Sequence, residues 1–198
     1  MTNVGDALAA AVLGADALGF IFVKSSPRYI APAEARNIIR QMPPFVTTVG
    51  VFADTALNDV LEIVKKTSLD CVQLHGEEPP EELARYPMPA YKSFHVDSGF
   101  HPEVLQRYAG SAYLLDTKVT GKLGGTGQIF NWDIAVEAKK YGRIILAGGL
   151  SPENIVEAVQ KVRPYAVDVN SGVEDHPGKK DHAKMKLLFD KLNQMENV

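Results

Sequence analysis

Short apolar runs alternate along this chain with longer segments in which apolar positions recur at helical spacing. The apolar runs are nearly continuous, which is typical of parallel strands buried on both faces. They cover residues 17–22, 47–52, 71–74, 90–94, 112–116, 144–146 and 166–169. The helical patterns cover residues 4–13, 32–41, 57–66, 79–86, 102–108, 132–140, 152–161 and 181–193. This alternation predicts a parallel α/β sheet.

The numbers of predicted helices and strands indicate how that sheet closes. There are about eight helical segments but only about seven strands, and the sequence opens inside a helical segment. A closed barrel of eight parallel strands needs one more strand before it. Proline and glycine clusters are brief and scattered, so no linker is indicated. We therefore expect one domain over residues 1–198, a (β/α)8 TIM barrel that lacks its first strand in the sequence as given.

Composition narrows the classes of partner. A net charge of -3 gives no general attraction to nucleic acid. The apolar stretch 7–23 is preceded by Asp6 and interrupted by Asp16, which favours a helix and a strand over a signal peptide. The single cysteine, Cys71, excludes an internal disulfide and permits a reducing compartment. We expect a cytoplasmic protein with no nucleic-acid or membrane partner.

Two strand ends near the C-terminus predict a phosphate site. The apolar runs in 144–149 and 167–172 each stop at glycine, and a helix start follows each. Backbone N–H groups at such turns bind phosphate, and barrels often build this site from the loops after their last two strands. Alternatively, the glycines simply end strands. The expected phosphate-binding residues are Gly148, Gly149, Ser171 and Gly172, with the Ser171 hydroxyl as an added donor.

Segments spread over nearly the whole chain resemble the phosphoribosylanthranilate isomerase family of tryptophan biosynthesis. Each segment alone is weak, but their order is highly specific. They are residues 14–20, 26–30, 49–52, 72–78, 114–118, 146–150, 152–154, 167–174 and 177–181. The resemblance implies a small phosphosugar substrate and an isomerase that uses no metal or cofactor.

The implied reaction is an Amadori rearrangement. N-(5-phosphoribosyl)anthranilate becomes 1-(2-carboxyphenylamino)-1-deoxyribulose 5-phosphate. A general acid protonates the ring oxygen, and a general base then removes the proton from the carbon beside the iminium. By its position, Asp116 corresponds to the family's acid, which must be protonated at neutral pH to donate. The alternative for Asp116 is a cap or an ion pair with Lys118.

Four further residues are substrate-binding candidates, Arg28 with support from the resemblance and the other three from their positions on strands. Arg28 is expected to pair with the anthranilate carboxylate or to align acid and substrate, although it could be a solvated loop arginine. Gln73 and His75 lie on one side of a strand end, where they could bind the sugar or anthranilate, or form a structural turn. Asp168 lies inside a strand, where a carboxylate is costly unless it is paired or used, so we expect it to support the site or to contact the substrate. The run 124–127 is similar to the family's mobile loop.

One departure from the family concerns the general base. The family's cysteine lies in a Lys-Ile-Cys-Gly-(Ile or Met)-Thr pattern, and residues 1–3 align with its tail. Cys71 cannot replace that cysteine by alignment, because it begins another strand. We therefore expect the sequence as given to be nearly inactive, and its two unpaired sheet edges to favour a homo-oligomer or a borrowed strand.

Three alternative functions stay open at this point. A relative of ribulose-phosphate epimerase would need metal-binding His and Asp at several strand ends, and His75 is the one histidine expected at such an end. The bifunctional sugar isomerase shared with histidine biosynthesis would need aspartates at two opposed strand ends. A truncated remnant would bind phosphate without turnover.

Overall fold

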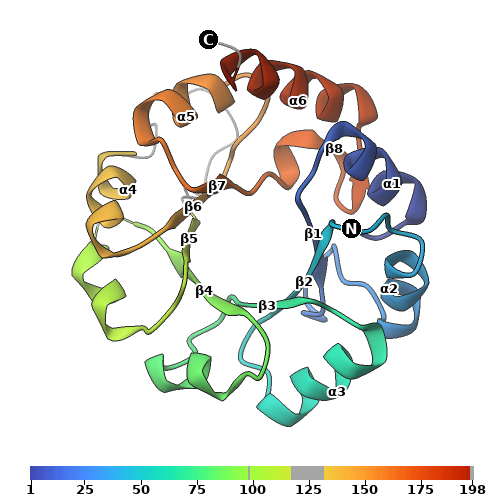
Figure 1. Ribbon diagram of the computed structural model, residues 1–198, viewed down its shortest axis with the longest axis horizontal. Helices are drawn as coiled ribbons and strands as arrows, with labels where there is room; N and C mark the ends of the chain where they lie inside the picture. The colour runs from blue at the N-terminus through green and yellow to red at the C-terminus, as the bar shows by residue number, and fades with distance from the viewer. Residues whose placement is uncertain (98, 117–131, 197–198) are drawn as a thin grey trace.

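Seven parallel strands curl around a common centre in the computed structural model, which describes residues 1–97, 99–116 and 132–196 (Figure 1). They pair strictly in chain order, and the helices lie outside them. The strands are β1 Ala17–Ile21, β2 Thr47–Phe52, β3 Cys71–Leu74, β4 Ala90–His95, β5 Tyr113–Asp116, β6 Ile144–Ala147 and β7 Ala166–Val167. The predicted (β/α) barrel is confirmed. β7 is shorter than predicted because it pairs with β6 alone and is an edge of this sheet.

Six α-helices and four 3₁₀ helices occur among the described residues. The α-helices are α1 Val4–Leu13, α2 Pro32–Ile39, α3 Leu57–Thr67, α4 Trp132–Ala138, α5 Ile155–Val162 and α6 His182–Glu196. The 3₁₀ helices are η1 Pro80–Arg85, η2 Pro102–Arg107, η3 Lys139–Tyr141 and η4 Ser171–Val173. No helix in the described ranges is long and apolar enough to cross a membrane.

The segments 79–86 and 102–108 form the 3₁₀ helices η1 and η2, whereas the sequence pattern predicted ordinary helices. Each is six residues long and begins with proline, which donates no backbone hydrogen bond. A segment of this length makes too few α-helical bonds to offset the cost of nucleation, so the tighter form is favoured.

β1 and β7 form the two ends of the sheet order, and residues 1–3 connect this region to the C-terminal part of the chain. The Met1 nitrogen donates to the Gly19 carbonyl in β1, and the Thr2 hydroxyl donates to the Gly178 carbonyl. Gly178 lies in the turn of an antiparallel hairpin, β8 Glu174–His176 and β9 Lys179–Lys180, that the sequence pattern did not predict.

Asp6 in α1 ties this N-terminal region to the hairpin and to α6. Its carboxylate is 1% exposed and accepts from Lys179 Nζ at 2.7 Å, from His182 Nε2 at 2.8 Å and from the Lys180 N–H at 2.8 Å. Burial of Asp6 opposes ionisation, but these donors outweigh it and hold its pKa well below the usual range. Asp6 therefore joins segments that are more than 170 residues apart in the chain.

Candidate active site

The carboxyl ends of β3, β5 and β7 bring several predicted residues together. Asp116 is the last residue of β5, while His75 and Asp168 directly follow β3 and β7. In a parallel barrel these strand ends share one rim. His75 Nε2 lies 3.7 Å from Asp116 Oδ2, and both side chains lie close enough to influence the carboxyl of Asp168. The structure therefore brings these three candidate site residues together.

Gln73 and His75 contact one another directly, and a tyrosine completes the group. Gln73 Nε2 is 3.1 Å from His75 Nδ1, and the Tyr91 hydroxyl donates to Gln73 Oε1 at 3.0 Å. Gln73 is buried, whereas the imidazole of His75 is 40% exposed. The buried amide of Gln73 therefore contacts the imidazole at Nδ1, while part of the ring stays exposed to solvent. Sequence reasoning missed Tyr91 because an aromatic in a strand pattern reads as core.

Asp168 has the electrostatics of a carboxyl inside a barrel. Part of its surface is open to solvent, but desolvation among the strand ends raises the pKa of its carboxyl. Lys180 opposes the rise, as does His75 when it is protonated, whereas Asp116 adds to the rise when it is ionised. The surroundings of Asp168 thus oppose its ionisation.

Arg28 is engaged by a residue that sequence reasoning did not consider. Its guanidinium pairs with Glu174, with Nη2 2.6 Å from Oε2. Lys180 Nζ lies 3.3 Å from the same carboxylate and donates to Asn170. Burial opposes ionisation of Glu174, but Arg28 and Lys180 outweigh it and lower its pKa. Burial in turn lowers the pKa of Lys180. Nothing in the apolar pattern marks Glu174 and Lys180 as buried charges.

The loop after β6 packs directly against the loop after β7. Gly148 and Gly149 have φ values of 86° and 66°, which favour glycine. A Cβ on Gly172 would lie 1.9 Å from the carbonyl oxygen of Leu150, so only glycine fits there. The N–H groups of Gly149, Ser171 and Gly172 have no hydrogen-bond acceptor among the described residues. Three of the predicted phosphate-binding residues, Gly149, Ser171 and Gly172, therefore lie on adjacent loops and carry backbone donors that a ligand could use.

Asn154 stabilises the loop after β6 through two hydrogen bonds. Its side-chain amide donates to the Gly149 carbonyl at 3.0 Å, and its Oδ1 accepts from the Ser151 N–H at 2.9 Å. These bonds occupy the segment in which the sequence pattern predicted the first helical turn, and α5 begins at Ile155 instead. The loop conformation is consequently fixed before the helix starts.

Other predicted or conceivable features lie elsewhere. The glycine-rich run 124–127 and Lys118 fall outside the described residues. Cys71 begins β3, at the opposite end of the strand from His75, and burial raises the pKa of its thiol to about 11. In the described ranges, no cluster of three His, Cys, Asp or Glu side chains is arranged to hold a metal ion.

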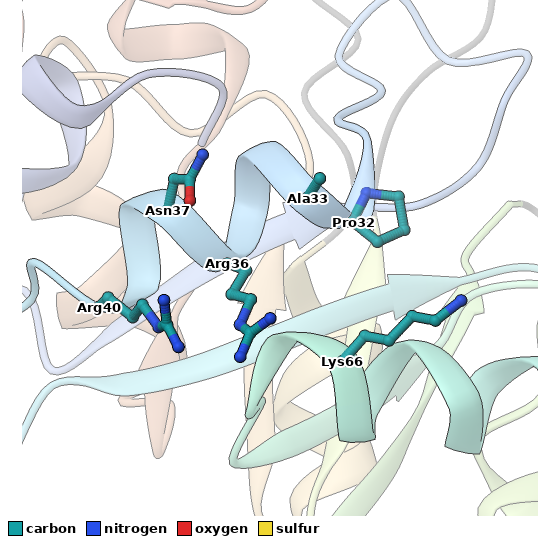
Figure 2. A pocket seen from close by; sticks show the side chains of 6 residues that line it. All are labelled: Pro32, Ala33, Arg36, Asn37, Arg40 and Lys66. Atoms are coloured by element: carbon teal, nitrogen blue, oxygen red, sulfur yellow. The ribbon is translucent and has the colours of Figure 1, made fainter.

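A basic groove on the helical layer is separate from this rim (Figure 2). It measures about 580 Å³ and lies between α2 and α3, outside the strand ends. None of its lining residues is a predicted site residue. They are Pro32, Ala33, Arg36, Asn37, Arg40 and Lys66. Its size alone does not make it the active site, because the groups that could move protons gather at the strand ends.

Comparison with known proteins gives consistent matches. Residues 1–191 match the family model described as N-(5'-phosphoribosyl)anthranilate (PRA) isomerase. Proteins named N-(5'-phosphoribosyl)anthranilate isomerase are similar over almost their full length. The Citrifermentans bemidjiense protein is 50% identical over 96% of this chain and 92% of its own. The Geobacter metallireducens protein is 48% identical over 94% and 92%.

Solved structures agree with the sequence matches. The phosphoribosyl anthranilate isomerase of Thermotoga maritima superposes with a TM-score of 0.89 at 41% identity, over 98% of this chain and 96% of that one. A phosphoribosyl anthranilate isomerase in complex with reduced 1-(o-carboxyphenylamino)-1-deoxyribulose 5-phosphate superposes with a TM-score of 0.87 at 38% identity, over 98% and 95%.

Proposed function

The chain belongs to the N-(5'-phosphoribosyl)anthranilate isomerase family, and from that premise we propose that it converts N-(5'-phosphoribosyl)anthranilate to 1-(2-carboxyphenylamino)-1-deoxyribulose 5-phosphate. The observation that carries the proposal is the meeting of Asp116 and His75 at the strand ends, 3.7 Å apart. The loops after β6 and β7 supply backbone donors at the same end of the barrel.

In this mechanism Asp116 is the general acid. Its protonated carboxyl gives a proton to the furanose ring oxygen as the C1–O bond breaks, and the anthranilate nitrogen forms an iminium with C1. A base then removes the C2 proton, and the electron pair of that C–H bond moves to form the enolamine. Ketonisation of the enol gives the product, so the reaction is an isomerisation without added oxidant or reductant.

The remaining candidates bind the substrate. Gly148, Gly149, Ser171 and Gly172 receive the phosphate, while Gln73, His75 and Asp168 contact the sugar. Arg28 uses Nε and Nη2 for Glu174, which leaves Nη1 to pair with the anthranilate carboxylate. No step requires a metal or another cofactor, so we expect turnover to survive chelation.

Cys71 is unsuited to be the general base of this reaction. Cys71 lies at the wrong end of β3, and its pKa of about 11 leaves the thiol protonated at neutral pH. We propose that the base is the family's cysteine, on a strand that would pair between β1 and β7. We further propose that the protein can form a homo-oligomer, in which the sheet edges at β1 and β7 are candidate contact surfaces. We also propose a cytoplasmic location, where the other steps of amino-acid biosynthesis take place.

Loss of substrate fluorescence measures the turnover directly. Residues 1–198 are compared with the same chain preceded by a strand that carries the family's cysteine, each with and without Asp116→Asn. We expect the longer chain to turn over, and Asp116→Asn to slow it about 10²–10⁴-fold. Cys71→Ser is the matched control and should retain turnover. Phosphate binding with no turnover in either chain would contradict the proposed function and identify a binding protein.

A further inference from the structure

We propose that Tyr91 is a positioning residue that, through Gln73, holds the His75 imidazole with its proton on Nε2, the nitrogen that faces Asp116. The consequence for turnover rests on the proposed function, but the tautomer itself does not. Tyr91 lies in β4, directly in register with Gln73 in β3, so both side chains project from the same face of the sheet.

The hydrogen bonds run in one direction along this row. The Tyr91 hydroxyl donates to Gln73 Oε1 at 3.0 Å, and the amide nitrogen of the same glutamine is 3.1 Å from His75 Nδ1. An amide nitrogen can only donate, so Nδ1 must be the acceptor. A neutral imidazole with an unprotonated Nδ1 carries its hydrogen on Nε2. Nε2–H then faces Asp116 Oδ2 at 3.7 Å.

Burial makes this direction difficult to reverse. Gln73 is 4% exposed, so both ends of its amide need partners within the protein. Burial, together with the nearby charge of Asp168, raises the pKa of the Tyr91 hydroxyl far above its ordinary value, which keeps it a donor. If the hydroxyl is removed, the Gln73 oxygen loses its donor. Rotation of the amide, which turns this oxygen toward the imidazole, then becomes more favourable.

The backbone around His75 is fixed independently of this row. The His75 N–H donates to the Phe52 carbonyl at 2.7 Å. On either side, Lys92 Nζ donates to the Gly76 carbonyl at 2.5 Å and approaches the Leu74 carbonyl at 3.5 Å. Removing the Tyr91 hydroxyl should therefore change the protonation and orientation of the ring without moving its backbone.

The consequence for the reaction is electrostatic. When Asp116 gives up its proton, a carboxylate forms beside His75. An N–H held toward that carboxylate stabilises the developing negative charge, whereas a bare nitrogen would oppose it. The separation of 3.7 Å is long for a direct hydrogen bond and suits a bridging water or substrate oxygen. Tyr91 thus acts on the chemical step through His75 rather than by touching the substrate.

Nitrogen-15 NMR of histidine-labelled protein tests the tautomer without any substrate. Protonated and unprotonated ring nitrogens give separate signals, and the chain has five histidines, so His75→Asn assigns the signals of His75. We expect wild-type Nδ1 to be unprotonated and Nε2 to be protonated. Tyr91→Phe should produce a mixture of both tautomers. A wild-type Nδ1–H, or a spectrum unchanged by Tyr91→Phe, would overturn the proposal.

A matched control removes a different hydroxyl. The Tyr86 hydroxyl is buried with no hydrogen-bond partner among the described residues, so Tyr86→Phe removes an equivalent atom without breaking a bond. In the actively turning-over form, Tyr91→Phe should lower kcat about 3- to 10-fold and leave KM within about 2-fold, while Tyr86→Phe changes neither. If no substrate is turned over but the NMR result holds, the proposed function fails and the positioning role stands.

Discussion

The carboxylate of Glu174 accepts two hydrogen bonds from the guanidinium of Arg28, with Nε 2.9 Å from Oε1 and Nη2 2.6 Å from Oε2. The side chain of Glu174 is 4% exposed and that of Arg28 is 21% exposed. A buried acid therefore holds a cation that is partly accessible to solvent. A two-point contact of this kind fixes the plane of the guanidinium as well as its position. The affinity of the site for a carboxylate should therefore depend on Glu174.

Glu174→Gln is expected to weaken substrate binding. The amide cannot accept both guanidinium donors, so Arg28 loses a charged hydrogen bond worth about 1.5–3 kcal/mol. We expect KM for N-(5'-phosphoribosyl)anthranilate to rise about 10-fold, with a smaller change in kcat. Steady-state kinetics measure both constants. Glu157→Gln changes an exposed acid on α5 and is the control. An unchanged KM would show that Arg28 is not held for the substrate.

Gly172→Ala is expected to destroy the phosphate site. The added Cβ would lie 1.9 Å from the Leu150 oxygen, so the loops after β6 and β7 must separate. Inorganic phosphate should raise the melting temperature of the wild type by binding the native state, and this rise should vanish in the variant. Gly5→Ala is the matched control, because its Cβ would meet its nearest neighbour at an ordinary 3.5 Å. An equal phosphate effect in Gly172→Ala would contradict the assignment.

Asp6 is expected to make the fold acid-sensitive. Its pKa is lowered in the folded protein, so its contribution to stability is complete above the ordinary value of about 3.9 and is lost as pH falls toward the lowered pKa. Urea unfolding between about pH 6 and about pH 3 should show this loss in the wild type below about pH 4. Asp6→Asn should be about 2–3 kcal/mol less stable at neutral pH and should show a flatter profile. Parallel profiles would exclude Asp6 as a source of the acid sensitivity.

Sequence patterns predicted the barrel well because parallel strands must be apolar on both faces. The run 71–74 matches β3 residue for residue although it contains the polar Gln73, because Val72 and Leu74 on either side of it are apolar and buried. The end of β7 was predicted too long, because an edge strand ends where its pairing ends and not where its apolar residues end. The 3₁₀ form of η1 depends on length and proline rather than on polarity.

Part of the site could also be predicted from the order of the strands and helices. Residues at strand ends, such as Asp116, can be found from the order of elements, because the topology places strand ends together. Glu174 and Tyr91 could not be found in this way. Their roles depend on which side chain lies across a strand or loop, and the distance from Glu174 to Arg28 spans 146 residues of sequence. Charge alone does not reveal such a pairing.

The buried ion pair of Lys92 and Glu78 is expected to hold the loop that carries His75. Lys92 Nζ lies 3.3 Å from Glu78 Oε2, both side chains are nearly inaccessible, and the same carboxylate accepts from the Gly76 N–H at 2.9 Å and the Asp54 N–H at 2.9 Å. Removing one charge leaves the other buried without its partner, so Lys92→Met should cost about 3–5 kcal/mol in urea unfolding.

The double variant distinguishes an unpaired charge from a simple loss of contacts. In Lys92→Met with Glu78→Gln neither charge remains, and the amide oxygen still accepts one backbone donor, so the double change should cost less than the sum of the single changes. Lys186→Met, which breaks an exposed pair with Asp190, should cost under about 1 kcal/mol. Strict additivity at Lys92 and Glu78 would mean that the two side chains act separately, and that the loop is held by its backbone alone.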